Sequence, residues 1–475
     1  RSVDVFVHDN PEFLPIFSAG DDEGQNASKV MAPSTAKNVL SVGASTTNPA
    51  GLVANFSAQG PSLDSRVKPD LVAPGVSICS GRAEAVSAPI GLTCGAGNHA
   101  NSGNPLYMSV SGSSQATAVV GGSVSLIREF IREDVGIQSP SASLLKAASI
   151  NGAIDLGTPD IPNSNEGWGQ ISVSNSVMPE YNGNALSTFH DNSRTLSAGF
   201  STLYQFDLDP TSGIDVTLVW TDVAGSANAP QSESRLVNDL DLKLTAPDGS
   251  VYKGNVFSNG FSTPNGVHDS VNNVERIKIA PSSALPSGKW QLTVTHAGGL
   301  DQAYAVVVTA DASLDQKADL LAFSGSIFPS SESPLVNDLI TIRISWLNQG
   351  TSAAGQFRVI LEDLTTGEEL FNQVRNSLDS GATDSLTLEH TFDSTGDHNM
   401  RLTLDAESDV EEINDELNGV NNNIEEMTIT VSALGVRLVA LDSNGNEDRN
   451  MVNQTLDPAV AEGYTWPVIL KHEGT

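Results

Sequence analysis

The sequence predicts an α/β domain with a parallel sheet and helices, followed by all-β sandwich domains. Three observations predict this. Over residues 116–131 apolar positions recur mostly at three- and four-residue steps, which is typical of one face of a helix. Beyond about residue 185 this mixed pattern gives way to alternating strands separated by turns. The 475 residues leave room for about three domains, each with its own core. We place the domains at residues 1–185, 186–314 and 315–433, with a truncated β module at 434–475.

Composition narrows the function classes. The formal net charge is -33, from 57 acidic and 24 basic residues spread along the chain. Such a surface disfavours nucleic acid and anionic membranes, and it suits calcium, cationic substrates or a saline medium. No apolar run approaches the roughly 20 residues that span a bilayer, so we expect no membrane insertion. The chain begins at Arg1 without a signal peptide, so we expect a fragment or processed product that lacks its N-terminal part.

Ser114 lies in the first turn of the predicted helix. Its small neighbours Gly112 and Ser113 would let a substrate backbone come close, and a helix N-terminus favours negative charge developing on a substrate oxygen. Taken alone, the stretch is more often a helix N-cap than a nucleophile.

Four blocks in one order change this balance. They are Pro33–Ala44, Phe56–Pro61, Lys68–Gly75 and Gly112–Ala118. Together they resemble the subtilisin-like serine proteases over roughly residues 1 to 180. The resemblance implies that residues 1–185 are the C-terminal part of a subtilisin-like catalytic domain. It also implies that Ser114 is the nucleophile of an endopeptidase that acts on protein or peptide substrates.

The chain departs from the family in its acid and base. The family order is Asp, His and Ser, and the Asp and His blocks would lie before Arg1. His8 lacks the family's setting, so we expect an exposed loop or helix-end residue. His99 lies in a Gly/Asn-rich loop and is also outside the expected block. We therefore expect the intact protein to be an enzyme and the fragment as given to be inactive.

The oxyanion hole departs as well, because Asp21 follows Ser18-Ala19-Gly20 where the family usually offers an Asn. An ionised carboxylate donates no hydrogen bond. Losing one donor costs on the order of a hundred- to a thousandfold in turnover, a figure measured on subtilisin itself. Two alternatives stay open. Either Asp21 weakens or shifts activity, or it is a loop carboxylate and the Ser114 backbone N–H forms the hole.

The two cysteines, Cys79 and Cys94, are fifteen positions apart. A disulfide fits this pairing and a secreted or extracellular protein, with two free thiols as the alternative. The bridge would stabilise the fold by roughly 3 kcal/mol in the loop-entropy model. Attachment to a cell surface through a missing C-terminal part stays open.

Residues 186–314 show strands at 214–220, 236–244 and 288–294. This set resembles the jelly-roll domain that follows the catalytic domain in some large subtilases and in proprotein convertases. Asn238, Asp239 and Asp241 offer the oxygen ligands that calcium prefers, together with Asp269, Asn272, Asn273 and Glu275. The alternative is that these residues bond to turn backbones. Bonding to turn backbones is the more common role of such residues, so structural calcium stays open beside it, and we expect no organic cofactor.

Residues 315–433 form a second β unit with a strand near 340–350, which resembles the Ig-like adhesion-related domains of bacterial and archaeal surface proteins. We expect it to act as a spacer or to bind a partner. Two functions therefore follow from the sequence. The first is a secreted serine endopeptidase, and the second is a non-catalytic extracellular binding or adhesion protein on a degenerate protease fold.

Overall fold

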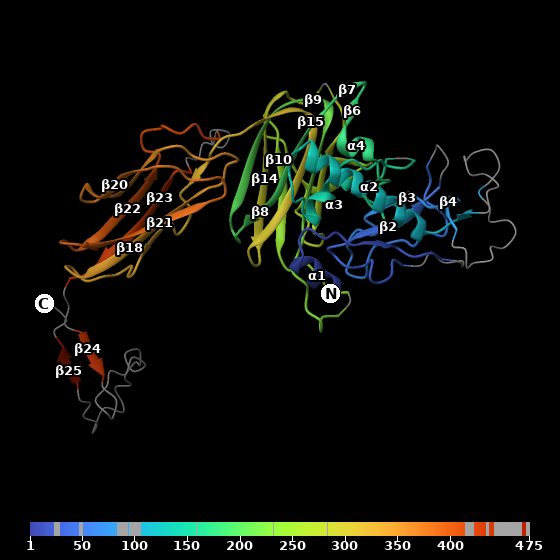
Figure 1. The fold of residues 1–475 in the computed structure, drawn as a ribbon. Coiled ribbons are helices and arrows are strands. Elements are labelled where there is room, and N and C mark those ends of the chain that lie inside the picture. Colours follow the sequence, from blue (N-terminus) through green and yellow to red (C-terminus); the bar gives the residue numbers. More distant parts are fainter. Residues whose placement is uncertain are drawn as a thin grey trace. The chain divides into compact units, whose positions relative to one another are not determined.

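The computed structural model describes residues 1–22, 29–46, 51–82, 94, 106–157, 159–230, 232–282, 284–413, 422–433, 437–440 and 468–471. The chain divides into two compact units, Arg1–Lys317 and Ala318–Thr475. Figure 1 shows their elements. The first unit contains the predicted α/β domain and the β region of residues 186–314, so these two regions form one compact body.

A small parallel sheet lies at the centre of the α/β region. Its order is β1 (Ile16–Ser18), β2 (Leu40–Ser45) and β3 (Leu71–Pro74), and both pairings are parallel. Every residue of β2 is buried, as expected for a parallel strand that is covered on both faces. The parallel sheet that the sequence predicts is therefore confirmed.

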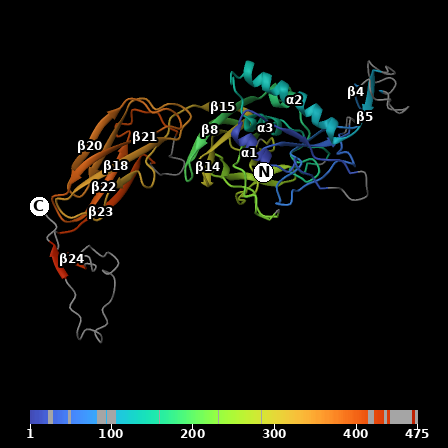
Figure 2. The same cartoon turned by 60° about the horizontal axis from the view of Figure 1, so that its bottom comes forward.

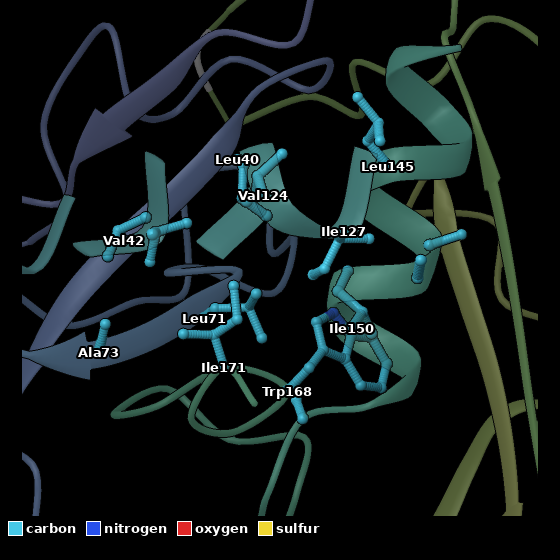
Figure 3. Close-up of a cluster of buried hydrophobic side chains, with 14 of the residues drawn as sticks. Leu40, Val42, Leu71, Ala73, Val124, Ile127, Leu145, Ile150, Trp168 and Ile171 are labelled. Carbon is cyan, nitrogen blue, oxygen red and sulfur yellow. The ribbon is translucent and has the colours of Figure 1, made fainter. Parts of the chain in front are cut away.

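The helices of this region are α1 (Ser2–Asp9), α2 (Ser113–Glu133), α3 (Ala142–Asn151) and α4 (Val173–Val177). Figure 2 shows α2 along its length, with α3 beside it. Of the predicted stripe of α2, Val119 is partly buried and the other members are buried, namely Ala116, Val120, Val124, Ile127 and Ile131. In Figure 3 side chains of this stripe lie in one cluster with residues of β2 and β3. Among the described residues no helix is both long and apolar enough to cross a membrane.

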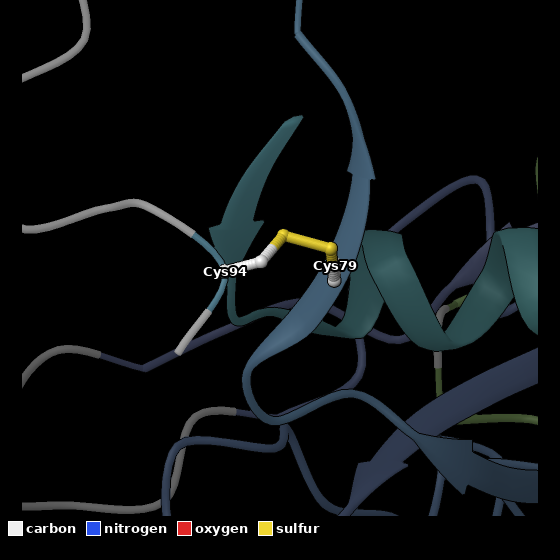
Figure 4. Close-up of a disulfide and its surroundings, with 2 residues drawn as sticks. All are labelled: Cys79 and Cys94. Atoms are coloured by element: carbon white, nitrogen blue, oxygen red, sulfur yellow. A yellow bond between two sulfur atoms is a disulfide. The ribbon is translucent and has the colours of Figure 1, made fainter. Parts of the chain in front are cut away.

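A short antiparallel pair leads into α2. It consists of β4 (Ile78–Gly81) and β5 (Tyr107–Val110), and β5 ends two residues before the N-cap of α2. Cys79 of β4 is bonded to Cys94, with 5.5 Å between their Cα atoms (Figure 4). The predicted disulfide is confirmed, and the alternative of two free thiols is excluded.

After the hairpin of β6 (Glu180–Tyr181) and β7 (Asn184–Ala185), eight antiparallel strands form one large sheet. They are β8 (Ser187–Leu196), β9 (Ser201–Trp220), β10 (Asp239–Thr245), β11 (Val251–Ser258), β12 (Phe261–Pro264), β13 (Val274–Ile279), β14 (Gly288–Gly298) and β15 (Gln302–Asp315). The long strand β9 pairs with β14 along its first part and with β13 along its last part.

The two faces of this sheet have different partners. One face forms a core of its own around Tyr204, Trp220 and Trp290. The other face contributes Val219, Val274, Ala305 and Val307 to the same hydrophobic cluster as α2 and α3. Because the helices pack directly on the large sheet, the α/β region and the β region share a core.

Buried charges also join the two regions. The Lys37 ammonium contacts the Asp222 carboxylate and donates to the Val223 carbonyl at 2.7 Å. The Arg276 guanidinium lies 2.6 Å from Asp215 and donates to the Asn151 carbonyl at 3.0 Å. Charges with so little contact with water are tolerated only when they are paired and hydrogen-bonded. Each region therefore supplies ion-pair and hydrogen-bond partners for buried charges of the other.

The second unit is a β-sandwich with one core. One sheet holds β16 (Leu320–Leu321), β17 (Ile327–Pro329), β18 (Leu339–Asn348) and β21 (Thr383–Thr391). The other holds β19 (Phe357–Asp363), β20 (Glu368–Arg375), β22 (Gly396–Leu404) and β23 (Ile424–Val431). Beyond them β24 (Arg437–Ala440) pairs with β25 (Val468–Lys471), and the rest of the module predicted at 434–475 lies outside the described residues.

Candidate active site

Ser114 is the second residue of α2, and its side chain is exposed. Two glycines bring the backbone of this helix start against the end of β3. The Gly112 N–H donates to the Gly75 carbonyl at 2.8 Å, and a Cβ on Gly75 would lie 2.7 Å from the Gly112 carbonyl oxygen. The Lys68–Gly75 block and the Ser114 block are therefore in direct contact.

Asp21 lies at the same point, three residues after β1 ends. Its Oδ1 accepts the Ser113 N–H at 2.7 Å. The preceding residue reinforces this contact, because the Gly20 N–H donates to the Ser113 Oγ at 3.3 Å. The structure thus brings the predicted oxyanion-hole residue next to the predicted nucleophile. It also shows the carboxylate accepting a hydrogen bond from the helix.

The first turn of α2 leaves one N–H free among the described residues. The Ser113 N–H is taken by Asp21, and the N–H groups of Gln115 and Ala116 reach the Gly112 carbonyl at 3.2 and 3.3 Å. Neither the N–H nor the Oγ of Ser114 has a hydrogen-bond partner in the described part of the chain. A free N–H at a helix N-terminus can stabilise an oxyanion beside the hydroxyl.

No described histidine is hydrogen-bonded to Ser114. His8 lies in the last turn of α1, is exposed and has its Nδ1 3.5 Å from Asp9, which confirms the helix-end expectation. His99 lies outside the described residues.

A buried carboxylate, that of Asp70, holds together residues next to the parallel sheet of β1, β2 and β3. The Asp70 carboxylate lies 2.7 Å from the Lys68 ammonium and 2.9 Å from that of Lys146, and it accepts the Ser41 N–H at 2.7 Å. Burial lowers the pKa of Lys68 to about 7, although the negative charge of Asp70 acts to raise it. The Lys68-Pro69-Asp70 segment therefore has a structural role, which its sequence pattern alone did not reveal.

The predicted calcium ligands fare unequally. Asn238 is fully buried, donates to Gln302 at 2.7 Å and accepts the Leu300 N–H at 2.8 Å, so its side chain has structural partners already. Asp239 keeps a buried Oδ1 that accepts no hydrogen bond among the described residues, and the buried Oδ1 of Asp241 lies 3.1 Å from the Nδ1 of His268. Burial and the neighbouring Asp241 raise the pKa of Asp239 to about 6. Such oxygens fit a cation, whereas the Asn238 amide does not.

Within the described part of the chain, one acidic group brings three ligand atoms within 4.8 Å of one another, namely Asp155, Asp160 and Glu166. Glu166 is buried, accepts the Leu156 N–H at 3.0 Å and is also bonded to Asn163. These residues come from one irregular loop. Their sequence spacing follows no metal-binding pattern, which is why sequence reasoning missed them.

Comparison with known proteins gives a family match for part of each compact unit. The model of the subtilase family matches residues 3–169, and that of the CARDB family matches residues 317–425. Residues 3–169 therefore match the subtilase family, which has a serine-protease fold, and a match to the all-β CARDB family follows.

The curated relatives are much longer than this chain. The serine protease/ABC transporter B family protein tagA of Dictyostelium discoideum is 36% identical over 279 residues, covering 53% of this chain and 15% of the relative. Its counterpart tagD from the same organism is 30% identical over 292 residues, covering 48% of this chain and 15% of the relative. The match thus spans about 15% of these relatives' length.

Two solved structures are similar to parts of the chain at low overlap. The CARDB domain of the PF1109 protein from Pyrococcus furiosus is 21% identical, with a TM-score of 0.21, covering 25% of this chain and 90% of that one. The patellamide maturation protease PatA is 21% identical, with a TM-score of 0.26, covering 36% of this chain and 52% of that one.

Proposed function

We propose that this chain is part of a secreted serine endopeptidase in which Ser114 is the nucleophile. The observation that carries the proposal is the start of α2, where an exposed hydroxyl lies beside its own unpartnered N–H. The subtilase match of residues 3–169 supports it. The disulfide between Cys79 and Cys94 and the acidic composition support secretion.

In the proposed reaction the Ser114 Oγ attacks the carbonyl carbon of a peptide bond while a histidine takes its proton. The oxygen of the tetrahedral intermediate accepts the Ser114 N–H, at the positive end of the α2 dipole. The histidine then protonates the leaving amine, and water releases the acyl group from Ser114. We propose that the histidine and the aspartate that orients it come from polypeptide upstream of Arg1.

The test is peptide hydrolysis by the longer protein that carries this chain, compared with its Ser114→Ala variant. The expected result is hydrolysis that Ser114→Ala lowers by a factor on the order of a thousand or more. Ser125→Ala is the matched control, because Ser125 is an exposed serine on the same helix whose hydroxyl only bonds back to Gly121. Equal activity in the Ser114→Ala variant would overturn Ser114 as the nucleophile, whereas no hydrolysis by the longer wild-type protein would overturn the proposal and favour a binding or adhesion protein.

Two accessory roles complete the proposal. Asp239 and Asp241 of β10 bind calcium, which stabilises the β region; the buried Oδ1 of Asp239, which accepts no hydrogen bond among the described residues, supports this, and Asn238 takes no part. The CARDB domain acts as a spacer or binds a partner, without catalytic residues.

A further inference from the structure

We propose that Asp21 is a positioning residue whose carboxylate fixes the first turn of α2, and that the oxyanion is left to the Ser114 N–H. This inference rests on the proposed role of Ser114 as nucleophile. It gives Asp21 a function different from that of the Asn usually found at this place, because the carboxylate holds the helix and does not contact the substrate.

The helix start needs a cap that its own sequence does not provide. The N-cap residue is Gly112, which has no side chain and makes no side-chain cap. Asp21 supplies the missing acceptor from a segment 92 positions away, at 2.7 Å from the Ser113 nitrogen. Its Oδ2 lies where only glycine leaves room, since a Cβ on Gly112 would be 2.9 Å from it.

A second contact makes the attachment a two-point clamp of Gly20, Asp21 and Ser113. The Ser113 side chain is buried, and its Oγ accepts the Gly20 N–H at 3.3 Å. Ser113 is thus held by both its backbone and its hydroxyl, immediately before the proposed nucleophile. Any movement of Asp21 is transmitted directly to Ser114.

The charge of Asp21 suits this role. A carboxylate that accepts a backbone N–H at a helix N-terminus makes a charge-assisted hydrogen bond and interacts favourably with the helix dipole. The same carboxylate has no proton to donate to a substrate oxygen. The clamp therefore strengthens the positioning of Ser114 and leaves its N–H as the described donor of the hole.

The experiment compares Asp21→Ala and Asp21→Asn in the longer, active protein. Asp21→Ala removes the acceptor, so kcat should fall about 100-fold with little change in KM, as expected for a misplaced nucleophile. Asp21→Asn keeps an amide oxygen that can accept the Ser113 N–H, so it should retain most of the activity. Asp22→Asn is the matched control, because it removes the same charge one residue away from the clamp.

Hydrogen exchange of a peptide covering residues 109–118 provides a readout that does not depend on activity. Exchange in this peptide should become faster in Asp21→Ala and stay unchanged in Asp22→Asn. A wild-type rate in Asp21→Ala together with a rise of about 100-fold in Asp21→Asn would overturn the proposal, because Asp21 would then be a defective oxyanion residue. Unchanged exchange in Asp21→Ala would also overturn it. If Ser114→Ala has no effect, the proposed function fails, while the exchange experiment still tests the clamp.

Discussion

At the scale of single residues, the site is decided by which hydrogen bonds are already made. Ser114 is exposed and unpartnered in the described part of the chain, while its neighbour Ser113 is buried and bonded at both its N–H and its hydroxyl. The sequence placed Ser114 in the nucleophile block and Asp21 at the position of the oxyanion-hole residue, but it left open whether Asp21 weakens or shifts activity or is a loop carboxylate. That choice depends on a contact between segments far apart in the chain, which local patterns do not encode.

A pH dependence is expected from Lys68. Its pKa is lowered by burial to about 7, whereas in the unfolded chain it returns to the ordinary value of 10.5. Between these values the unfolded state binds more protons than the folded state, so this group makes the free energy of unfolding rise with pH from about 7 to 10.5. Urea unfolding of wild type and Lys68→Met at several pH values checks this.

The Lys68→Met variant should lose the rise while Asp70 keeps Lys146 as its partner. Lys29→Met is the control, because Lys29 is exposed and, within the described residues, its ammonium donates only to the Gly60 carbonyl. A rise of equal size in Lys68→Met would contradict the assignment to this lysine.

At the scale of elements, apolar periodicity predicted the interiors of helices and strands better than their ends. The α2 stripe and the strands inside β9, β10, β14 and β18 follow from repeating apolar positions, whereas the parallel strands β2 and β3 follow from the family resemblance of their blocks. The predicted strand at 214–220 is only the last part of β9, which starts at Ser201. Polar residues and Pro210 interrupt the alternation there, and pairing with β14 and β15 extends the strand across the interruption.

Chelation should act on β10. If Asp239 and Asp241 hold calcium, removing it leaves two carboxylates close together and partly buried, so EGTA should lower the melting temperature. Differential scanning fluorimetry with calcium and with EGTA measures the shift. The Asp239→Asn variant should lose it, whereas Asp160→Asn, in the loop group near Glu166, should keep it. No shift in the wild type would remove the calcium proposal.

At the scale of the whole molecule, the shared core shows what domain-by-domain reading missed. The sequence suggests a boundary near residue 185, yet the first compact unit runs to Lys317. The reason is that Val219, Val274 and Val307 lie in the same hydrophobic cluster as α2 and α3, while their alternating pattern looks like that of any sandwich strand. Which face of a strand meets a neighbouring domain is not written in its own sequence.

The shared core and the buried ion pairs between the α/β region and the β region should make residues 1–317 unfold as one cooperative unit. Lys37→Met leaves the Asp222 carboxylate buried without its cation, at an expected cost of about 3–5 kcal/mol. Urea unfolding followed by the fluorescence of Trp168, Trp220 and Trp290 reports on both regions. All probes should shift together, and a loss confined to one region would contradict a shared unit. Ser125→Ala, on the exposed face of α2, is the control.

The burial of Lys37, Lys68 and Lys146, each at 2% exposure or less, also decides how this molecule could be attached to a solid support. Amine coupling reacts with lysines that reagents can reach, so immobilisation would proceed through exposed positions such as Lys289. The three buried ammonium groups, which pair with Asp70 and with Asp222, would stay unmodified. A resin-bound preparation should therefore keep the arrangement around Ser114 that it has in solution.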